Sequence, residues 1–449
     1  MLFVLIVLVW LYCGLSILIT KGLTRMSFFY IGILLVPATL RVIQISLLIG
    51  HTFFATMFVF SLVIHREFNI RTFSSLPVKG SVLFIFIASL LIGLFDSRVG
   101  PITGVQRGIT HFISTYFLIY VGWLSVDSVK SNIVLEDSYL TFFKRLLPVV
   151  FIMTIYGLIT AFTKSNPVLD TVGLEDRFFS EDMAAAGNYR AFRVTSFCVS
   201  SSVYGFACAI LFLCSFALPR HRTLLQTVVI VMLAINVFLS ATRAAIIPFL
   251  IGFCLFVILN NKSAKIISYI LIGLLALIMV IPILPSSISG YFGQVFNSII
   301  DVISPSGSGG SEYGGSSLSA RGMQILGAMQ YLKEKPLFGH GYAYFAEVIS
   351  QGEKDDVLLG MESYLCFIGV EYGIVYFIAV AIFIISCMGY FIRNRNIEKL
   401  YCDLGISLIV MFIFFLIFAW VGGCWYFIMP ILGYIMKIIR LSRYRMTVK

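Results

Sequence analysis

The chain has 449 residues, of which 59% are hydrophobic and only 12% are charged, with a formal net charge of +11. Soluble domains carry about twice that charged fraction, so the composition excludes a soluble globular protein and indicates a polytopic membrane protein. Most of the Lys and Arg residues fall in short loops that alternate between apolar spans. The positive charge therefore follows the positive-inside pattern and does not indicate nucleic-acid binding.

Apolar spans begin at the first residues and continue to the tail. They lie near residues 2–20, 27–49, 51–64, 81–96, 108–126, 146–163, 196–217, 224–240, 243–260, 265–284, 363–390, 401–420 and 424–438. Thirteen crossings are predicted, with twelve as the alternative if the first span does not cross the membrane. The predicted fold class is an all-α polytopic membrane protein with about 12–13 transmembrane helices and two long extracytoplasmic loops, the larger one partly helical.

Spans and loops divide the chain into five parts. These are N-terminal transmembrane helices (1–163), a first long extracytoplasmic loop (164–194), central transmembrane helices (195–284), a large extracytoplasmic loop with an amphipathic helix at 319–335 (285–361), and C-terminal transmembrane helices with a basic cytoplasmic tail (362–449). All nine cysteines lie in or beside apolar spans, so neither structural disulfides nor a zinc site is predicted.

Arginines at the end of the first long loop are candidates for binding an anion. Arg190 and Arg193 lie close to the membrane boundary, and the hydroxyl-rich segment that begins at Thr195 follows at once. Planar guanidinium groups suit anionic headgroups such as phosphates. The alternative is pairing with the carboxylates of the same loop, which is favoured for Arg177.

Another arginine lies where two spans are joined by almost no loop. The sequence SATRAAIIPF places Arg243 at the outer end of a helical hairpin, where its position is well defined. Its partner is either a lipid phosphate or the pyrophosphate of a substrate.

An amphipathic helix is predicted in the large second loop. Ser319 is a suitable N-cap and Pro336 ends the helical pattern. Helical spacing places Arg321, Ile325, Ala328 and Leu332 on one face, so we expect Arg321 to project from the apolar face. A buried arginine needs an anionic partner, either a carboxylate or the phosphate of a ligand.

Three residues after this helix are candidates for chemistry. His340 lies in a Gly-His-Gly turn and is a candidate general base or ligand contact, with an ordinary hydrogen-bonding role as the alternative. Glu362 stands at the mouth of the next span, where it can meet a sugar hydroxyl. Glu371 lies nine residues deeper, and an intramembrane carboxylate is either functional or bonded to a neighbouring helix.

Three segments together resemble the O-antigen polymerase and O-antigen ligase superfamily. They are the arginine followed by a Thr-Ser-Phe entry (193–197), the Ser-x-Thr-Arg hairpin (240–243), and the loop helix R-x(14)-P-x-x-G-x-G (321–341) followed by S-Y-L-x(5)-E-x-G (363–373). The resemblance covers about residues 190–380. It implies a membrane enzyme with about a dozen helices that acts on glycans carried by undecaprenyl pyrophosphate on the outer face of the inner membrane. It also implies that Arg193, Arg243 and Arg321 bind the donor.

The resemblance separates two enzyme classes at one position. Ligases of the superfamily carry a histidine before the Ser-Tyr-Leu segment, whereas this chain has Met361 and Glu362 there. The sequence therefore favours a polymerase that transfers a growing glycan onto a hydroxyl of the next lipid-linked repeat unit.

A pyrophosphate is a good leaving group, so arginines can support the transfer without a metal ion or a cofactor. Glu362 or His340 would accept the proton, and a single displacement predicts inversion.

Other classes remain as alternatives. A ligase would use the same donor and a different acceptor, and a transporter of lipid-linked glycans would catalyse no reaction. Transporters often show internal repeats, which this sequence lacks. We expect membrane lipids and undecaprenyl-pyrophosphate-linked glycans as partners, with a chain-length regulator and a flippase of the same pathway as further candidates. The expected location is the bacterial inner membrane, with the active site on the extracytoplasmic face and the C-terminus in the cytoplasm.

Overall fold

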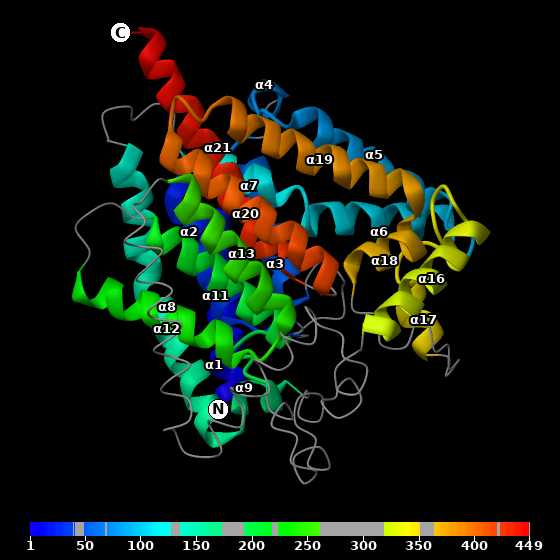
Figure 1. Cartoon of the computed structure of the whole chain (residues 1–449), viewed down its shortest axis with the longest axis horizontal. Helices are drawn as coiled ribbons and strands as arrows, with labels where there is room; N and C mark the ends of the chain where they lie inside the picture. The colour runs from blue at the N-terminus through cyan, green and yellow to red at the C-terminus, as the bar shows by residue number, and fades with distance from the viewer. Residues whose placement is uncertain are drawn as a thin grey trace.

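The chain is an all-α polytopic membrane protein (Figure 1). Its structure is a computed structural model that describes residues 1–38, 40, 49–67, 70–126, 135–172, 193–217, 223–260, 318–350, 363–419 and 423–448. The helices of the first half are α1 (Leu2–Ile19), α2 (Gly22–Leu35), α3 (Gly50–Ile64), α4 (Ile70–Ser74), α5 (Lys79–Leu94), α6 (Pro101–Ser114), α7 (Leu118–Leu124), α8 (Leu135–Thr163) and α9 (Pro167–Thr171).

The helices of the second half follow in the same order along the chain. They are α11 (Ser201–Phe216), α12 (Leu224–Leu239), α13 (Arg243–Leu259), α16 (Leu318–Glu334), α17 (Tyr344–Ser350), α18 (Tyr364–Phe367), the π-helical turn η5 (Ile368–Tyr372), α19 (Gly373–Arg393), α20 (Lys399–Phe418) and α21 (Trp425–Val448). The described residues contain no β-strand.

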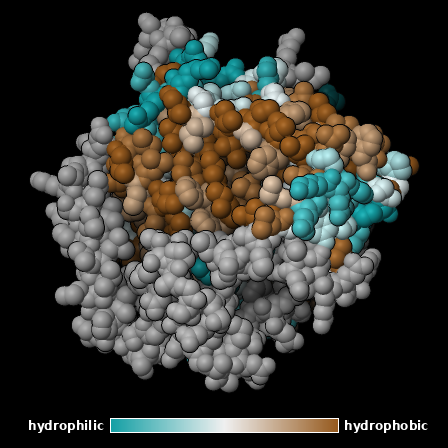
Figure 2. Space-filling model, turned by 45° about the vertical axis from the view of Figure 1, so that its right-hand side comes forward, coloured by the Kyte–Doolittle hydropathy of each residue, from teal (hydrophilic) through white to brown (hydrophobic). Residues whose placement is uncertain are grey.

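Length and hydropathy identify the helices that can cross a membrane. Five described helices are long and apolar enough by themselves, namely those within 2–19, 138–163, 364–393, 399–418 and 425–444, and six shorter apolar helices accompany them. A broad apolar band covers the described surface in Figure 2, with hydrophilic residues along its edge. Such a band is what lipid contact requires. The predicted span 265–284 and residues 39 and 41–48 of the predicted span 27–49 lie outside the described residues, so the number of crossings remains a prediction.

One predicted span does not form a single helix. The stretch 108–126 is divided between α6 and α7, with a break at residues 115–117. Helix α7 packs tightly along α21, where Gly122 lies against the carbonyl of Pro430 and Gly433 lies against the carbonyl of Ile119. This approach of two backbones turns α7 away from the direction of α6. The predicted span 108–126 therefore consists of two helical segments, the end of α6 and the whole of α7.

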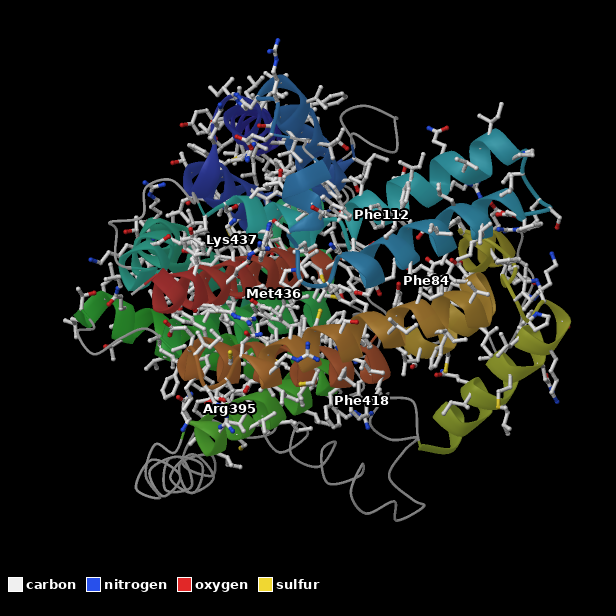
Figure 3. All side chains as sticks on the ribbon, turned by 90° about the horizontal axis from the view of Figure 1, so that it is seen from above. Phe84, Phe112, Arg395, Phe418, Met436 and Lys437 are labelled. Carbon is white, nitrogen blue, oxygen red and sulfur yellow. The ribbon has the colours of Figure 1, made fainter. Side chains whose placement is uncertain are left out.

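Helix α21 occupies the middle of the bundle. In Figure 3 it carries the labelled Met436 and Lys437, and it lies between the N-terminal helices on one side and α20 on the other. The hairpin of α5 and α6, marked by Phe84 and Phe112, extends to one side of this centre. The hairpin packs against α19, and α16 and α17 lie at its far end in Figure 1.

Basic loops that the sequence places on one side meet at one end of the bundle. Arg25 forms a buried ion pair with Glu67 of the next loop. Arg440 near the C-terminus donates to the carbonyl of Ser75. Arg395 forms an ion pair with Asp403 and donates to the carbonyl of Leu259 over 2.9 Å. These contacts agree with a common side for the loops, as the charge pattern predicts.

The loop helix begins and ends within one residue of the predicted bounds, but its buried face differs. Gln324, Ala328 and Tyr331 face the protein, with Gln324 only 8% exposed. Ile325, expected on the buried face, is 52% exposed. The helix packs on η5 and α18, and this contact rotates the buried stripe away from Ile325.

Candidate active site

The Gly-His-Gly turn pairs with the break between η5 and α19. His340 N donates to the carbonyl of Val370 and Gly341 N donates to the carbonyl of Glu371, each over 2.9 Å. In return, Ile374 N donates to the carbonyl of Pro336 over 2.9 Å. A helix break leaves backbone groups without partners inside the helix. The turn supplies those partners, so the loop is fixed to the membrane helix through its backbone.

Glycines are required where these two segments meet. Gly373 has φ +70° and Gly339 has φ +63°, a region that side chains disfavour. A Cβ on Gly373 would lie 2.5 Å from Gly339 N, and a Cβ on Gly339 would lie 2.5 Å from the carbonyl carbon of Glu371. The glycines at 339 and 373 therefore serve a close backbone contact between the loop and the helix.

The carboxylate of Glu371 anchors the segment that follows the turn. Its oxygens accept hydrogen bonds from Phe345 N over 2.9 Å and from Ala343 N over 3.3 Å. Glu371 is only 1% exposed. The sequence left two roles open for Glu371, a functional one and a hydrogen bond to a neighbouring helix. The structure supports the hydrogen-bonding role, but the partner is the backbone of the loop and not a membrane helix. A buried carboxylate without these donors would be costly.

His340 is held in a defined orientation. Its Nε2 lies 3.2 Å from the carbonyl of Tyr331, so the ring donates from Nε2 and carries its lone pair on Nδ1. The imidazole stacks on Tyr344, with ring centroids 4.5 Å apart. Glu334 Oε2 lies 3.6 Å from the same Nε2. Among the described residues, no hydrogen-bond partner occupies Nδ1.

Burial lowers the pKa of His340 below its usual value of 6.5, and the positive charges of Lys335 and Arg98 act in the same direction. The hydrogen bond to the carbonyl of Tyr331 and the charge of Glu334 oppose this change. The imidazole is therefore neutral near pH 7. A neutral histidine with a free Nδ1 lone pair can accept a proton from a hydroxyl.

Two arginines that the sequence reading did not single out lie beside this turn. Arg98 Nη1 lies 2.6 Å from Glu347 Oε2, and Arg107 Nη1 lies 3.2 Å from Glu347 Oε1. Both arginines also donate to the carbonyl of Tyr342 over 2.9 Å. Arg98 is further paired with the buried carboxylate of Asp96. Charged residues at the tip of a short hairpin could have indicated a polar contact there, but the residues that pair with them are far away in the sequence.

Two of the predicted donor-binding arginines are brought together elsewhere in the fold. Arg243 is the first residue of α13, at the tip of the α12–α13 hairpin, as the sequence predicts. Arg193 precedes α11, and the next residue, Val194, donates from its backbone N to the carbonyl of Leu239 over 3.3 Å. The two arginine-bearing segments therefore lie side by side, and both side chains are partly exposed.

A buried asparagine fixes the segment that carries Arg193. The amide nitrogen of Asn166 donates to Thr195 Oγ1 over 2.9 Å and to the carbonyl of Ser196 over 2.8 Å. Its oxygen accepts from the hydroxyl of Tyr156 over 2.8 Å. Asn166 also caps α9, since its oxygen accepts from Leu169 N. The amide thus joins α8, α9 and the entry to α11.

Some predicted site residues have no described geometry. Arg190 and Glu362 lie outside the described residues. Arg321 lies in the first turn of α16, but its side chain is not part of the description. The described candidates form two groups, with Arg193 and Arg243 on α11–α13 and His340 on the loop held by α5, α6 and α19.

Comparison with known proteins identifies the central part of the chain. Residues 228–381 match the family described as O-antigen ligase. This segment includes Arg243, α16, the His340 turn and Glu371. No match was found among curated proteins. Members of the matched family are glycosyltransferase-like enzymes, either polymerases or ligases, and act on lipid-linked glycans. The match over residues 228–381 therefore confirms the resemblance of this part of the chain to the O-antigen polymerase and ligase superfamily.

Proposed function

We propose that this protein is a polysaccharide polymerase, of the O-antigen, capsule or exopolysaccharide type. It would transfer a growing glycan from undecaprenyl pyrophosphate onto a hydroxyl of an incoming undecaprenyl-pyrophosphate-linked repeat unit. The observation that carries this proposal is His340. It lies within the matched family segment, its ring is oriented by a backbone carbonyl, and Nδ1 has no hydrogen-bond partner among the described residues.

The reaction would be a single displacement at the anomeric carbon. A bond forms between this carbon and the acceptor oxygen, and the bond to the pyrophosphate oxygen breaks. The acceptor proton passes to Nδ1 of His340 or to Glu362, and the pyrophosphate leaves with its lipid. Attack opposite the leaving group inverts the configuration at the anomeric carbon.

Arginines would bind the leaving group in this scheme. Arg193 and Arg243 lie on adjacent segments, and Arg190 and Arg321 complete the proposed pyrophosphate site. Guanidinium groups stabilise the negative charge that develops on the leaving pyrophosphate. The reaction needs neither a metal ion nor a cofactor, because the leaving group is activated before it reaches the enzyme.

The setting of the reaction belongs to the same proposal. The protein would lie in the bacterial inner membrane with its site on the extracytoplasmic face and its C-terminus in the cytoplasm. A flippase would deliver the repeat units, and a chain-length regulator would limit the product. A ligase is the second candidate, because the matched family carries that description. The residues at positions 361 and 362 favour the polymerase.

A gel of surface glycan tests this proposal. A strain that lacks the protein should lose the long ladder and keep a single repeat unit on the final acceptor. Wild type should restore the ladder, whereas Arg243→Ala should reduce it severely. Arg145→Ala is the matched control, because Arg145 is exposed on α8 and donates to Thr24 at the basic end of the bundle. Loss of all attached glycan, with long chains left on the lipid carrier, would identify a ligase instead.

A further inference from the structure

The tip of the α5–α6 hairpin meets the His340 turn in a cluster of four charges. Asp96, Arg98 and Arg107 come from the hairpin, and Glu347 comes from α17. Two positive and two negative charges cancel, so the cluster has no surplus charge with which to hold a phosphate. Its hydrogen bonds instead connect two parts of the chain that are more than two hundred residues apart.

Arg98 makes the largest number of these connections. Its Nε lies 3.1 Å from Asp96 Oδ1, its Nη1 lies 2.6 Å from Glu347 Oε2, and its Nη2 lies 2.9 Å from the carbonyl of Tyr342. The side chain of Asp96 is fully buried, and it also lies against Gly341. A planar guanidinium group that is hydrogen-bonded on three sides has little conformational freedom.

The same guanidinium reaches the stack that holds the imidazole. Arg98 Cζ lies 5.2 Å from the centre of the Tyr344 ring, and that ring stacks on His340. Arg98 therefore fixes the backbone after His340 through the carbonyl of Tyr342 and fixes the ring beside it through Tyr344. A shift of Arg98 would be passed to Nδ1 of His340.

We infer that Arg98 is a positioning residue for the reaction, and that it acts by holding His340 against the acceptor hydroxyl. This inference rests on the proposed role of His340 as the base. Misplacing a reacting group by about 1 Å costs roughly 100-fold in rate. We therefore expect Arg98→Ala to lower the turnover rate by about 10–100-fold with little change in the KM for the donor.

A double-mutant cycle on the full-length protein in lipid nanodiscs tests this inference. The rate of glycan transfer is measured for wild type, Arg98→Ala, His340→Ala and the double variant, with Arg145→Ala as the matched control. If Arg98 acts through His340, the second substitution has little further effect once His340 is gone. Independent, multiplying losses would overturn the inference, as would an Arg98→Ala protein with the wild-type rate.

Two further measurements separate positioning from mere folding. The acidic limb of the pH–rate profile should move to higher pH in Arg98→Ala, since a nearby positive charge and part of the burial of His340 are removed. Tyr331 and Glu334 on α16, Lys335 directly after α16 and Tyr344 on α17 also face the imidazole. Arg98→Lys keeps the positive charge but loses the planar guanidinium group. It should therefore restore the acidic limb of the pH–rate profile to its wild-type pH but restore only part of the transfer rate. If the transfer rate of Arg98→Ala fell only in proportion to the fraction of folded protein, and the acidic limb stayed at its wild-type pH, a positioning role would be contradicted.

Failure of the proposed function would be visible in the same experiment. Wild-type protein that elongates no lipid-linked repeat unit, but transfers glycan to another acceptor, would refute the polymerase. The cycle can then be measured with that acceptor, so Arg98 is judged separately.

The outer face of α16 carries a second inference from an independent observation. Ile325, Leu326 and Met329 are 52%, 64% and 52% exposed, respectively. Leu337 follows with 57% exposure, and its carbonyl accepts from Val375 N at the start of α19. Next to it, Ile374 begins the exposed apolar face of α19, which is part of a candidate membrane span. Exposed apolar residues thus lie on the loop helix, at Leu337 and on the membrane span to which Leu337 is bonded.

We propose that this face of α16 contacts the bilayer at the outer interface. The exposed apolar residues of α16 lie close to the start of a membrane span and Lys333 and Glu334 lie at the end of the helix, which allows the apolar residues to enter the interface while the charged ones stay in water. A cysteine-linked fluorophore at Leu326 or Met329 should be quenched by nitroxide-labelled lipid and protected from aqueous iodide. The same label at Lys333 should show the reverse. Iodide quenching at all three positions would overturn the proposal, and shielding of Leu326 from both quenchers would indicate a second protein copy instead.

Discussion

Asn166 illustrates how one buried amide can fix a functional segment. Both of its polar atoms are used, and three elements meet at this side chain. The sequence reading did not single out Asn166, because an Asn-Pro pair after a span reads as an ordinary helix start. Thr195 lies next to Asn166 only in the folded protein. The asparagine thus determines where the backbone next to Arg193 lies.

Substitution of Asn166 by alanine should weaken donor binding. The change leaves the buried hydroxyl of Thr195 and the carbonyl of Ser196 without their donor, at a cost of about 1–3 kcal/mol in folding stability. The released segment carries Arg193, so the KM for the donor should rise. Thermal unfolding and donor-dependent rates check both effects. Asn260→Ala is the control, because its amide only caps the end of α13. An unchanged donor KM in Asn166→Ala would show that Arg193 is fixed by other contacts.

His340 predicts a pH dependence with a definite sign. Its pKa lies below 6.5 because burial disfavours the charged form. A base acts only when neutral, so activity is present above that pKa and is lost as the pH falls through it. The midpoint of the acidic limb of the kcat/KM profile should therefore lie below pH 6.5. His340→Gln should remove this limb. A limb above pH 6.5 would be inconsistent with His340 as the base.

At the scale of elements, the contact between the loop and α19 explains the glycine pattern. The motif P-x-x-G-x-G ends at Gly341, and the motif E-x-G ends at Gly373. The backbones of the two motifs bond to each other, and the carboxylate of Glu371 accepts hydrogen bonds from Ala343 N and Phe345 N. Much of the family resemblance in this region thus reflects how the loop is fixed to the membrane helix. The π-helical turn before Gly373 opens the carbonyls that the loop uses.

Gly339→Ala should detach the turn from α19. The new methyl would meet the backbone of Glu371 in a region of φ that alanine avoids, so we expect a loss of about 1–3 kcal/mol. Glycan transfer should fall more than membrane insertion does, because the helices themselves are unaffected. Gly389→Ala is the matched control, since open space surrounds Gly389 in α19. Faster exchange of the amide hydrogen of His340 would report detachment, and wild-type protection would contradict it.

At the scale of the whole molecule, contacts between distant loops agree with one topology. The hairpin tip at 95–107 meets the loop at 336–347, and the sequence places both outside. The basic loops meet at the other end, through Arg25, Arg395 and Arg440. The termini lie at opposite ends in Figure 1. An even number of crossings would bring the termini to one end, so this placement agrees with an odd number of crossings.

Labelling of introduced cysteines tests the sidedness of the molecule. In intact cells, a membrane-impermeant thiol reagent should label Ser97→Cys and should not label Lys399→Cys until the membrane is opened. Unmodified protein sets the baseline for the native cysteines, of which Cys254 is exposed. The reverse pattern would place the candidate active site in the cytoplasm and exclude an extracytoplasmic polymerase.

The sequence by itself determined the class, the helices and several candidate residues. Composition alone requires a membrane protein, because so few charges cannot cover a soluble surface. Helical spacing and Pro336 placed α16 within one residue of its bounds, although Ser319, the predicted N-cap, lies inside the helix, and a near-absent loop placed Arg243 at the first residue of α13. These features depend on residues that are close along the chain, so local patterns contain them.

Only the tertiary structure decided which side chains meet. The break between α6 and α7, the rotated face of α16 and the partners of Arg98 all arise from contacts between distant segments. Helical periodicity predicts that a face is apolar, but not whether lipid or protein covers it. In a chain this hydrophobic, the two environments select similar residues. Close backbone packing and a few buried polar bonds therefore determine how the helices and the candidate site are arranged.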